Sequence, residues 1–227
     1  MQALVIIPAR GGSKGIPEKN SKLLGGKPLI QYTIESALDC FEPTQIIVST
    51  DSEKIREIAV NLGINVPSLR PDHLATDTAS SYDVILHCLD EADQNDIAYD
   101  CVVLLQPTSP FREGAHIKEA LALYSSELDM VVSVNESDEN PYYSLFEEDP
   151  AGFLNKSKEG NFTRRQDCPK VYSYNGAIYV MNPESLRKES LSSFKKVRKY
   201  VMDTSCSVDL DTPHDWKLAE FLLLNRS

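Results

Sequence analysis

The chain has 227 residues, of which 41% are hydrophobic and 25% charged, a length and composition typical of a globular domain with a sizeable core. Its net charge of -11 argues against a nucleic-acid-binding protein, and no run approaches the roughly 20 apolar residues of a membrane-spanning helix. The five cysteines form no Cys-x-x-Cys pair and no basic leader opens the chain, so we expect a cytoplasmic protein without a disulfide framework or zinc site.

Short β-rich apolar segments alternate with segments of helical periodicity along most of the chain. Nearly continuous apolar runs predict buried strands at residues 3–7, 45–48, 101–105, 130–134 and 177–181. Apolar stripes with helical spacing lie between them, at residues 30–38, 55–62, 84–92 and 117–124. This alternation predicts an α/β fold with a Rossmann-like, mostly parallel sheet flanked by helices, and ligands at the carboxyl ends of its strands.

The segment after the first predicted strand is rich in glycine and basic residues, and it reads Pro8-Ala9-Arg10-Gly11-Gly12-Ser13-Lys14-Gly15-Ile16-Pro17-Glu18-Lys19-Asn20. Glycines let backbone N–H groups approach phosphate oxygens, while Arg10, Lys14 and Lys19 supply positive charge. The pattern fits neither a Walker A loop nor the Gly-x-Gly-x-x-Gly dinucleotide motif. Residues 1–34 hold five basic residues and one acid, so we expect a local anion pocket rather than a basic surface turn.

A polar excursion interrupts the alternation in the second half of the chain. Residues 147–170 are mostly polar and are broken by Gly152, Gly160 and Pro169. An excursion of this length in a compact domain usually serves a function or an interface. Because no repeat or linker separates two units, we expect a single domain over residues 1–227, with residues 140–170 as a small β-rich excursion.

Two aspartates stand just before the last predicted helix. Asp209 and Asp211 alternate in an extended stretch, so both carboxylates project to one side. Two such oxygen ligands suit Mg²⁺, although an Asp-x-Asp by itself is more often a surface turn. The helix that follows begins at Thr212, its expected cap, and for Asp215 we favour capping over catalysis.

An ordered series of motifs resembles the acylneuraminate cytidylyltransferases, the enzymes that make CMP-sialic acid and its bacterial analogues. The resemblance spans nearly the whole chain and is carried by Ile7–Asn20, Val48–Asp51, Arg70-Pro71, Ala75–Ser81, Leu104–Arg112, Arg164–Gln166, Asn175–Tyr179 and Ser207–Asp211. It implies transfer of CMP from CTP to the anomeric hydroxyl of a nine-carbon acidic sugar, with release of pyrophosphate. It also implies Mg²⁺ as cofactor and a homodimer in which the excursion completes the sugar site of the partner.

The resemblance assigns roles to residues of the nucleotide side. Positions that match Lys14 and Lys19 hold the triphosphate, and those that match Asp209 and Asp211 bind the metal. The implied nucleotide contacts are Ala9, Arg10, Ser13, Lys19, Asn20, Arg70, Ala79 and Ser81, and the implied catalytic residues are Arg10, Lys14, Lys19 and Asp211. For Ser80 and Ser81, capping of the helix at residues 84–92 is an equally good interpretation and is compatible with base contact.

The resemblance places Gln106, Arg165, Asn175 and Tyr179 at the acidic sugar. A guanidinium suits a carboxylate through two parallel hydrogen bonds, which fits Arg165. Sialic acid enzymes carry Lys and Arg where this chain has Tyr143 and Ser173. We therefore expect a differently decorated sugar, such as a legionaminic or pseudaminic acid.

Two other functions stay open at this point. The cytidylyltransferase for the eight-carbon sugar acid of lipopolysaccharide shares the opening loop, but Arg164-Arg165-Gln166 and Asn175-Gly176 argue against it. A nucleotide-binding module without turnover needs no metal carboxylates, so the presence of Lys19, Asp209 and Asp211 argues against that function.

Overall fold

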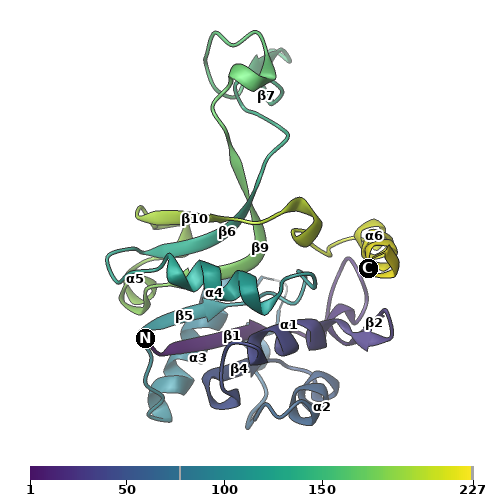
Figure 1. Ribbon diagram of the computed structural model, residues 1–227, viewed down its shortest axis with the longest axis vertical. Helices are drawn as coiled ribbons and strands as arrows, with labels where there is room; N and C mark the ends of the chain where they lie inside the picture. Colours follow the sequence, from purple (N-terminus) through teal and green to yellow (C-terminus); the bar gives the residue numbers. More distant parts are fainter. Residues whose placement is uncertain (77, 226–227) are drawn as a thin grey trace.

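The apolar segments form one six-stranded sheet in the computed structural model, which describes residues 1–76 and 78–225 (Figure 1). The strands in spatial order are β10 (Val197–Val201), β6 (Met130–Glu136), β9 (Tyr172–Met181), β5 (Cys101–Leu104), β1 (Ala3–Pro8) and β4 (Ile46–Ser49). β9 runs antiparallel to both β5 and β6, whereas the other neighbouring pairs are parallel. The expected α/β fold with a mostly parallel sheet is confirmed.

Helices cover both faces of this sheet because successive side chains of its strands point to opposite sides. In β1, Val5 and Ile7 belong to one buried cluster, and Leu4 and Ile6 belong to another. The first cluster lies under α1 (Leu29–Leu38), α2 (Glu53–Asn61) and α4 (Gly114–Ala122). The second lies under α3 (Ser81–Gln94) and α5 (Pro183–Lys188).

A third buried cluster joins the two ends of the chain outside these layers. Ile16 of the opening loop packs with Phe111, Leu210 and Trp216. Trp216 belongs to the last helix, α6 (Pro213–Asn225), whose Thr212 hydroxyl accepts the N–H of Asp215 at 3.3 Å, as expected of a cap. The cluster therefore holds the basic loop, the loop after β5 and the Asp209–Asp211 segment in one place.

The short elements complete the chain. The opening loop carries a small hairpin of β2 (Leu23–Leu24) and β3 (Lys27–Pro28). Short 3₁₀ turns occur at Lys19–Ser21, Pro43–Gln45, Asp72–Leu74, Arg165–Asp167, Leu191–Ser193 and Thr204–Cys206. In the described part of the chain, each helix is too short or too polar to cross a bilayer.

Residues 137–171, here called the arm, project from the sheet between β6 and β9 (Figure 1). The arm contains an antiparallel hairpin of β7 (Phe146–Glu148) and β8 (Leu154–Lys156), and thus forms the expected small β-rich excursion. Phe153 and Leu154 of this hairpin are 69% and 68% exposed. An isolated two-stranded hairpin is only marginally stable in water, and this one exposes apolar side chains to solvent.

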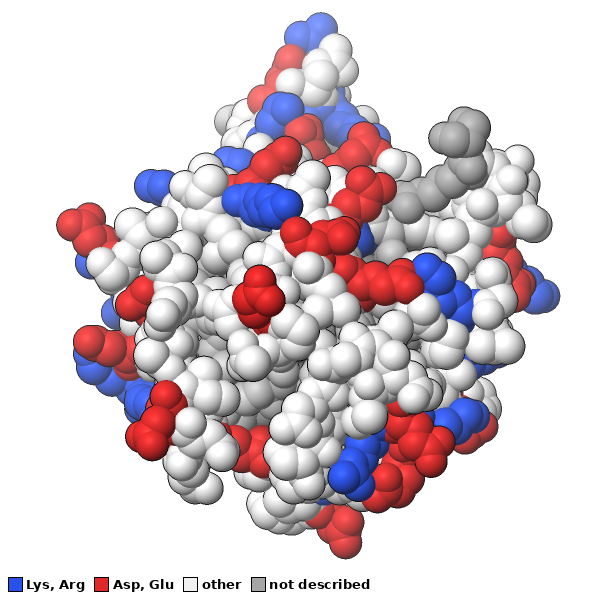
Figure 2. Space-filling model, turned by 60° about the horizontal axis from the view of Figure 1, so that its bottom comes forward, with Lys and Arg blue, Asp and Glu red and all other residues white. Residues whose placement is uncertain are grey.

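Surface charge is mixed on the face shown in Figure 2, where Lys and Arg are scattered among Asp and Glu without forming a broad basic area. The concentration of positive charge expected from the sequence lies in the loop that follows β1, which carries Arg10, Lys14 and Lys19.

Candidate active site

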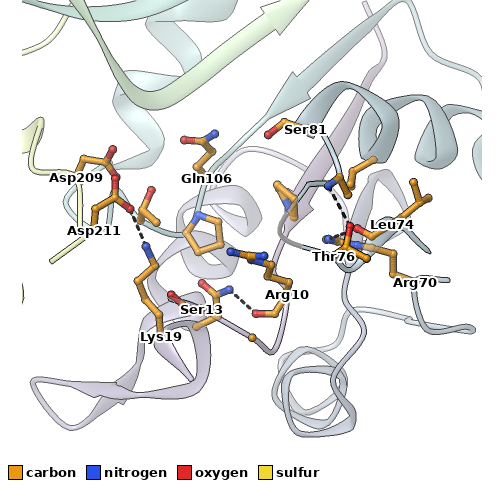
Figure 3. Close-up of a pocket in the computed structure, with 17 residues that line it drawn as sticks. Arg10, Ser13, Lys19, Arg70, Leu74, Thr76, Ser81, Gln106, Asp209 and Asp211 are labelled. Atoms are coloured by element: carbon orange, nitrogen blue, oxygen red, sulfur yellow. Dashed lines mark hydrogen bonds and ion pairs between the residues drawn. The ribbon is translucent and has the colours of Figure 1, made fainter. Parts of the chain in front are cut away.

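A cavity of about 400 Å³ opens at the carboxyl ends of β1 and β5, where ligands bind in open α/β sheets (Figure 3). Its walls come from the opening loop, the start of α3, the loop after β5 and the Asp209–Asp211 segment. Most of the expected site residues line it: Arg10, Ser13, Lys19, Asn20, Arg70, Ala79, Ser81, Gln106, Asp209 and Asp211.

Lys19 connects the basic loop to the aspartate segment. Its Nζ donates to the carbonyl of Leu210 at 2.6 Å and to Oδ1 of Asp211 at 2.9 Å. The loop approaches so closely that a Cβ on Gly15 would lie 2.1 Å from the carbonyl oxygen of Asp211. Only glycine fits there, so its place in the motif has a steric reason. The contact puts cationic and anionic side chains on facing walls of one cavity.

The rest of the opening loop is held by the strand beside it. The N–H of Ala9 donates to the carbonyl of Ser49 at 2.8 Å, so Ala9 extends the pairing of β1 and is fully buried beside the cavity. Nδ2 of Asn20 donates to the carbonyl of Arg10 at 2.9 Å, while its buried Oδ1 accepts no hydrogen bond from the described residues. Lys14 belongs to the same loop but is not part of the cavity wall.

The end of the cavity near α3 is lined by uncharged side chains, both apolar and hydroxyl-bearing, around the cation Arg70. Arg70 is buried, and its Nε donates to the hydroxyl of Ser49 at 3.0 Å. Burial lowers the pKa of Arg70 from its ordinary value. Ser80 is the cap of α3, with its Oγ accepting from the N–H of Asp83 at 3.1 Å, and Ser81 is left to line the cavity. Capping is thus shown for Ser80, and contact of Ser81 with the base stays a prediction.

The sequence did not single out several other residues of the wall. Leu74, Thr76 and Val84 line the neutral end, while Pro107 and Thr108 follow Gln106. All of these except Leu74 and Val84 lie inside motifs that carry the family resemblance. Their closeness in sequence to a predicted site residue was therefore the signal that could have identified them.

Asp209 and Asp211 both face the cavity (Figure 3). Asp209 is exposed to the cavity, and partial desolvation by the cavity wall raises the pKa of its carboxyl. A hydrogen bond from Thr108 opposes this shift, and the negative charge of Asp211 adds to it. Two neighbouring carboxylates disfavour each other's ionised form, and a bound cation relieves that repulsion. Because the candidate ligands are hard carboxylate oxygens at the wall of the cavity, they fit Mg²⁺.

The turn after these carboxylates is fixed by Asp215. Its Oδ2 accepts the backbone N–H groups of Asp211 at 3.1 Å and Thr212 at 2.7 Å. Partial desolvation acts to raise the pKa of Asp215, but the hydrogen bonds from Thr212 and Asp211 outweigh it and lower the pKa. These contacts match the capping role expected of Asp215.

The expected sugar residues are not gathered in one place. Gln106 lines the cavity, whereas Asn175 is buried behind the wall and Tyr179 is mostly buried in β9, where burial raises its pKa. Arg165 lies in the arm and forms an ion pair with Asp138. Among the four, only Gln106 belongs to the cavity lining of the described chain.

Arg112 is a positioning candidate that the sequence did not reveal. It is buried beneath Gln106, and its Nη1 donates to the carbonyls of Gln106 at 3.1 Å and Ala177 at 2.8 Å. Burial lowers the pKa of Arg112 to about 9. The side chain thus ties the loop after β5 to β9.

Comparisons with known proteins agree with this geometry. The family profile described as cytidylyltransferase matches residues 4–224. N-acylneuraminate cytidylyltransferase of Streptococcus agalactiae serotype V is 41% identical over 95% of this chain, which spans about half (52%) of that relative. CMP-N,N'-diacetyllegionaminic acid synthase of Legionella pneumophila is 36% identical, with 98% of this chain and 97% of that protein covered. Pseudaminic acid cytidylyltransferase of Campylobacter jejuni is 30% identical, with 98% and 96% covered.

A similar fold occurs in a solved structure of CMP:2-keto-3-deoxy-manno-octonic acid synthetase complexed with CTP. The TM-score is 0.71 and 99% of each chain is covered, at 18% sequence identity. At that identity the likeness shows the fold alone. The profile match over nearly the whole length and the full-length relatives establish that this chain belongs to the cytidylyltransferase family.

Proposed function

We propose that the protein transfers CMP from CTP to the anomeric hydroxyl of a nine-carbon acidic sugar and releases pyrophosphate. The observation that carries this proposal is the contact of Lys19 with Asp211 inside one cavity. A phosphate-binding loop and a pair of metal-binding carboxylates facing each other are what nucleotidyl transfer requires. The names of the relatives supply the nucleotide and the sugar class.

In this reaction an O–P bond forms between the sugar and the α-phosphorus, the bond to pyrophosphate breaks, and the hydroxyl proton is released. Arg10 and Lys19 of the cavity wall, with Lys14 from the same loop beside it, would hold the triphosphate and stabilise the charge that moves onto the leaving group. Asp209 and Asp211 would hold Mg²⁺, which supplies further charge neutralisation when bound. The remaining contribution of the chain is positioning of the two substrates.

The neutral end of the cavity is proposed to hold the cytosine base. Ala79 and Ser81 offer a small side chain and a short polar one beside Arg70. A pocket whose polar groups match the exocyclic amine and ring carbonyl of cytosine would leave groups unpaired with another base. Thr76 adds a hydroxyl to the same wall.

The sugar side is proposed to be completed in a homodimer. The exposed Phe153 and Leu154 support burial of the arm against a second copy. Arg165 stands in this arm outside the cavity wall, so contact with the partner's cavity is a route by which it reaches a sugar carboxylate. The five cysteines are free thiols, which supports a reducing, cytoplasmic location.

For the identity of the sugar, we favour a legionaminic or pseudaminic acid over sialic acid itself. Tyr143 in the arm and Ser173 in β9 are exposed, and neither carries the positive charge expected in a sialic acid enzyme. Two relatives of similar length are enzymes of legionaminic and pseudaminic acid, by their names.

The direct test is release of pyrophosphate from CTP with a panel of acidic sugars. The panel should contain N-acetylneuraminic, N,N'-diacetyllegionaminic and pseudaminic acids and the eight-carbon 2-keto-3-deoxy-manno-octonic acid. We expect turnover with a nine-carbon acid and only background with the eight-carbon one. Turnover with the eight-carbon acid alone, or with none of the four, contradicts the proposal, and an Asp211→Asn variant supplies the background rate.

A further inference from the structure

Asn175 has no hydrogen-bonding capacity left for a substrate, although the sequence resemblance places it at the sugar. It is 4% exposed. Its Oδ1 accepts from the hydroxyl of Ser133 at 2.6 Å and from the N–H of Ala177 at 3.2 Å. Its Nδ2 donates to Oγ of Ser207 at 3.0 Å and faces Sδ of Met202 at 3.4 Å. An amide offers two donors and two acceptor sites, and these contacts occupy all four.

These bonds stabilise an interruption in the pairing of β9 with β6. The register shifts between Val132 and Val134, which marks a β-bulge. At this point the N–H of Ile178 donates to the hydroxyl of Ser133 at 2.7 Å, while Asn175 accepts the N–H of Ala177. Side-chain oxygens thus accept the N–H groups that lose a backbone carbonyl partner at the bulge, and these bonds fix the shape of the bulge.

The bulge points the backbone of β9 into the site. Gly176 has a φ of +74°, in the left-handed region that favours glycine. A Cβ there would lie 2.9 Å from Oε1 of Gln106 and 3.7 Å from Oδ2 of Asp209. The residue next to Asn175 is therefore in close contact with both the sugar side and the metal side of the cavity.

The bond to Ser207 connects this bulge with the aspartate segment. Ser207 precedes Asp209 by two residues, and its hydroxyl also donates to the carbonyl of Asp203 at 2.8 Å. Downstream of Asp209, the N–H of Leu210 donates to the carbonyl of Thr108 at 2.9 Å. The segment is thus held on both sides of Asp209, by Asn175 before it and Thr108 after it.

We propose that Asn175 is a positioning residue for Asp209: through Ser207 and the bulge at Gly176 it fixes the carboxylate in the orientation that binds a divalent cation. This inference rests on the proposed function, in which Asp209 is a metal ligand. Loss of a hydrogen-bonding residue behind a metal ligand typically weakens metal binding about 10- to 100-fold. We expect the lower end of that range, because Asp209 is also held through Thr108.

The experiment measures Mn²⁺ affinity of the ligand-free protein by electron paramagnetic resonance, together with kcat and both KM values. Asn175→Ala and Ser207→Ala should each weaken Mn²⁺ binding about tenfold. Because both remove the same link, the double variant should be little weaker than either single variant. Turnover at saturating substrates should fall, with little change in the KM of the sugar acid. If Asn175→Ala fails to fold, Ser207→Ala still tests the link.

The matched control is Asn182→Ala at the other end of β9. Asn182 is also a hydrogen-bonded asparagine, whose Oδ1 accepts the N–H of Glu184 at 2.8 Å and whose Nδ2 donates to Ser126 at 2.9 Å. Its loss should lower thermal stability through the uncapped α5 without changing Mn²⁺ affinity. Equal weakening of Mn²⁺ binding in this control would indicate general loosening and would overturn the positioning role.

Two further outcomes overturn the inference. A raised KM for the sugar acid in Asn175→Ala, with unchanged Mn²⁺ affinity, would make Asn175 a direct sugar ligand. Equal Mn²⁺ affinity in the wild type and Asp209→Asn would show that Asp209 is not a metal ligand, and the positioning role of Asn175 would then fail as well. Failure of the proposed function is distinguishable, because a protein that binds Mn²⁺ through Asp209 yet turns over no acidic sugar still gives a readable result.

Discussion

The cavity and the arm differ in how far along the chain their contacts reach. Lys19 contacts Asp211 across 192 residues, and Arg70 contacts Ser49 across 21. In the arm, Arg164 pairs with Asp167 only three residues away, at 2.8 Å. Arg165 reaches Asp138 across 27 residues, but this contact also stays within the arm. The cavity therefore joins segments from both ends of the chain, whereas these bonds of the arm are made within the arm itself.

The same contrast appears in the apolar side chains. Ile16, Leu210 and Trp216 are buried together behind the phosphate loop. Phe153 and Leu154 of the arm are mostly exposed. Burial of an apolar side chain contributes roughly 1.5–3 kcal/mol, so the arm has stabilisation still to gain from a second surface. We infer that the nucleotide side is complete in one chain and the sugar side is not.

The strongest test of the nucleotide side is Asp211→Ala. Loss of a metal ligand removes several kcal/mol of transition-state stabilisation, so kcat should fall on the order of a thousandfold with the fold intact. Steady-state kinetics at saturating Mg²⁺ and circular dichroism measure the two quantities. Asp203→Asn, which changes a capping carboxylate on the same segment outside the cavity wall, should keep a near-normal rate. Near-normal turnover in Asp211→Ala would refute the metal assignment.

Selection of the base is the second test of the inference that one chain supplies the whole nucleotide site. If Ala79 and Ser81 contact the base, UTP should react at least about a hundredfold less efficiently than CTP, because its carbonyl replaces the amine that the pocket matches. The ratio of kcat/KM for CTP and UTP, measured on one preparation of the protein, gives the base selectivity. The test does not depend on the oligomeric state. Equal efficiencies would mean that this end of the cavity does not select the base.

Arg165→Ala tests the incomplete side. A charge-assisted, bidentate contact contributes roughly 1.5–3 kcal/mol, so the KM of the sugar acid should rise about ten- to a hundredfold while that of CTP changes little. Arg164→Ala is the matched control, since Arg164 is paired locally with Asp167. Sedimentation of both variants separates a ligand from an interface residue. An unchanged KM rules out the sugar contact, and dissociation to monomers would give Arg165 a structural role.

The smallest effect is expected for the stability of the folded protein in the Asp209→Asn variant. Because partial desolvation and Asp211 raise the pKa of Asp209, ionisation of Asp209 destabilises the folded state. The destabilisation is absent below the unfolded pKa near 4 and is complete above the raised pKa of the folded state. Asp209→Asn should therefore raise Tm at pH 7.5 and leave it unchanged at pH 3. Calorimetry that shows a lower Tm at pH 7.5 would contradict this balance of charges.

The sequence predicted the parts of the fold that depend on local patterns. Apolar runs marked the strands, and the expected residues 3–7 and 101–105 correspond to Ala3–Pro8 and Cys101–Leu104. β9 is longer than the apolar run at 177–181 because its first half, Tyr172–Gly176, is polar. That half pairs with β6 beyond the bulge, and no periodic pattern of apolar residues predicts a polar strand that pairs across a register shift.

The candidate site was predictable where a contiguous motif carried it. The opening loop and the two aspartates follow this rule, and they meet at Lys19 and Asp211. The direction of a side chain was not predictable, so a motif could not show that Asn175 turns into the core or that Arg112 lies beneath Gln106. Those orientations depend on which buried carbonyl or hydroxyl needs a partner, and this is decided by tertiary structure.

The most direct test of the central claim combines one defective cavity with one defective arm. Asp211→Ala and Arg165→Ala chains, co-expressed with different affinity tags and purified through both, give a heterodimer. If the arm acts on the partner's cavity, one of its two sites is intact. At a sugar concentration well below the KM of Arg165→Ala, such a dimer should show about half the wild-type activity. Activity no higher than the average of the two parent variants would contradict the account, because arm and cavity would then act within the same chain.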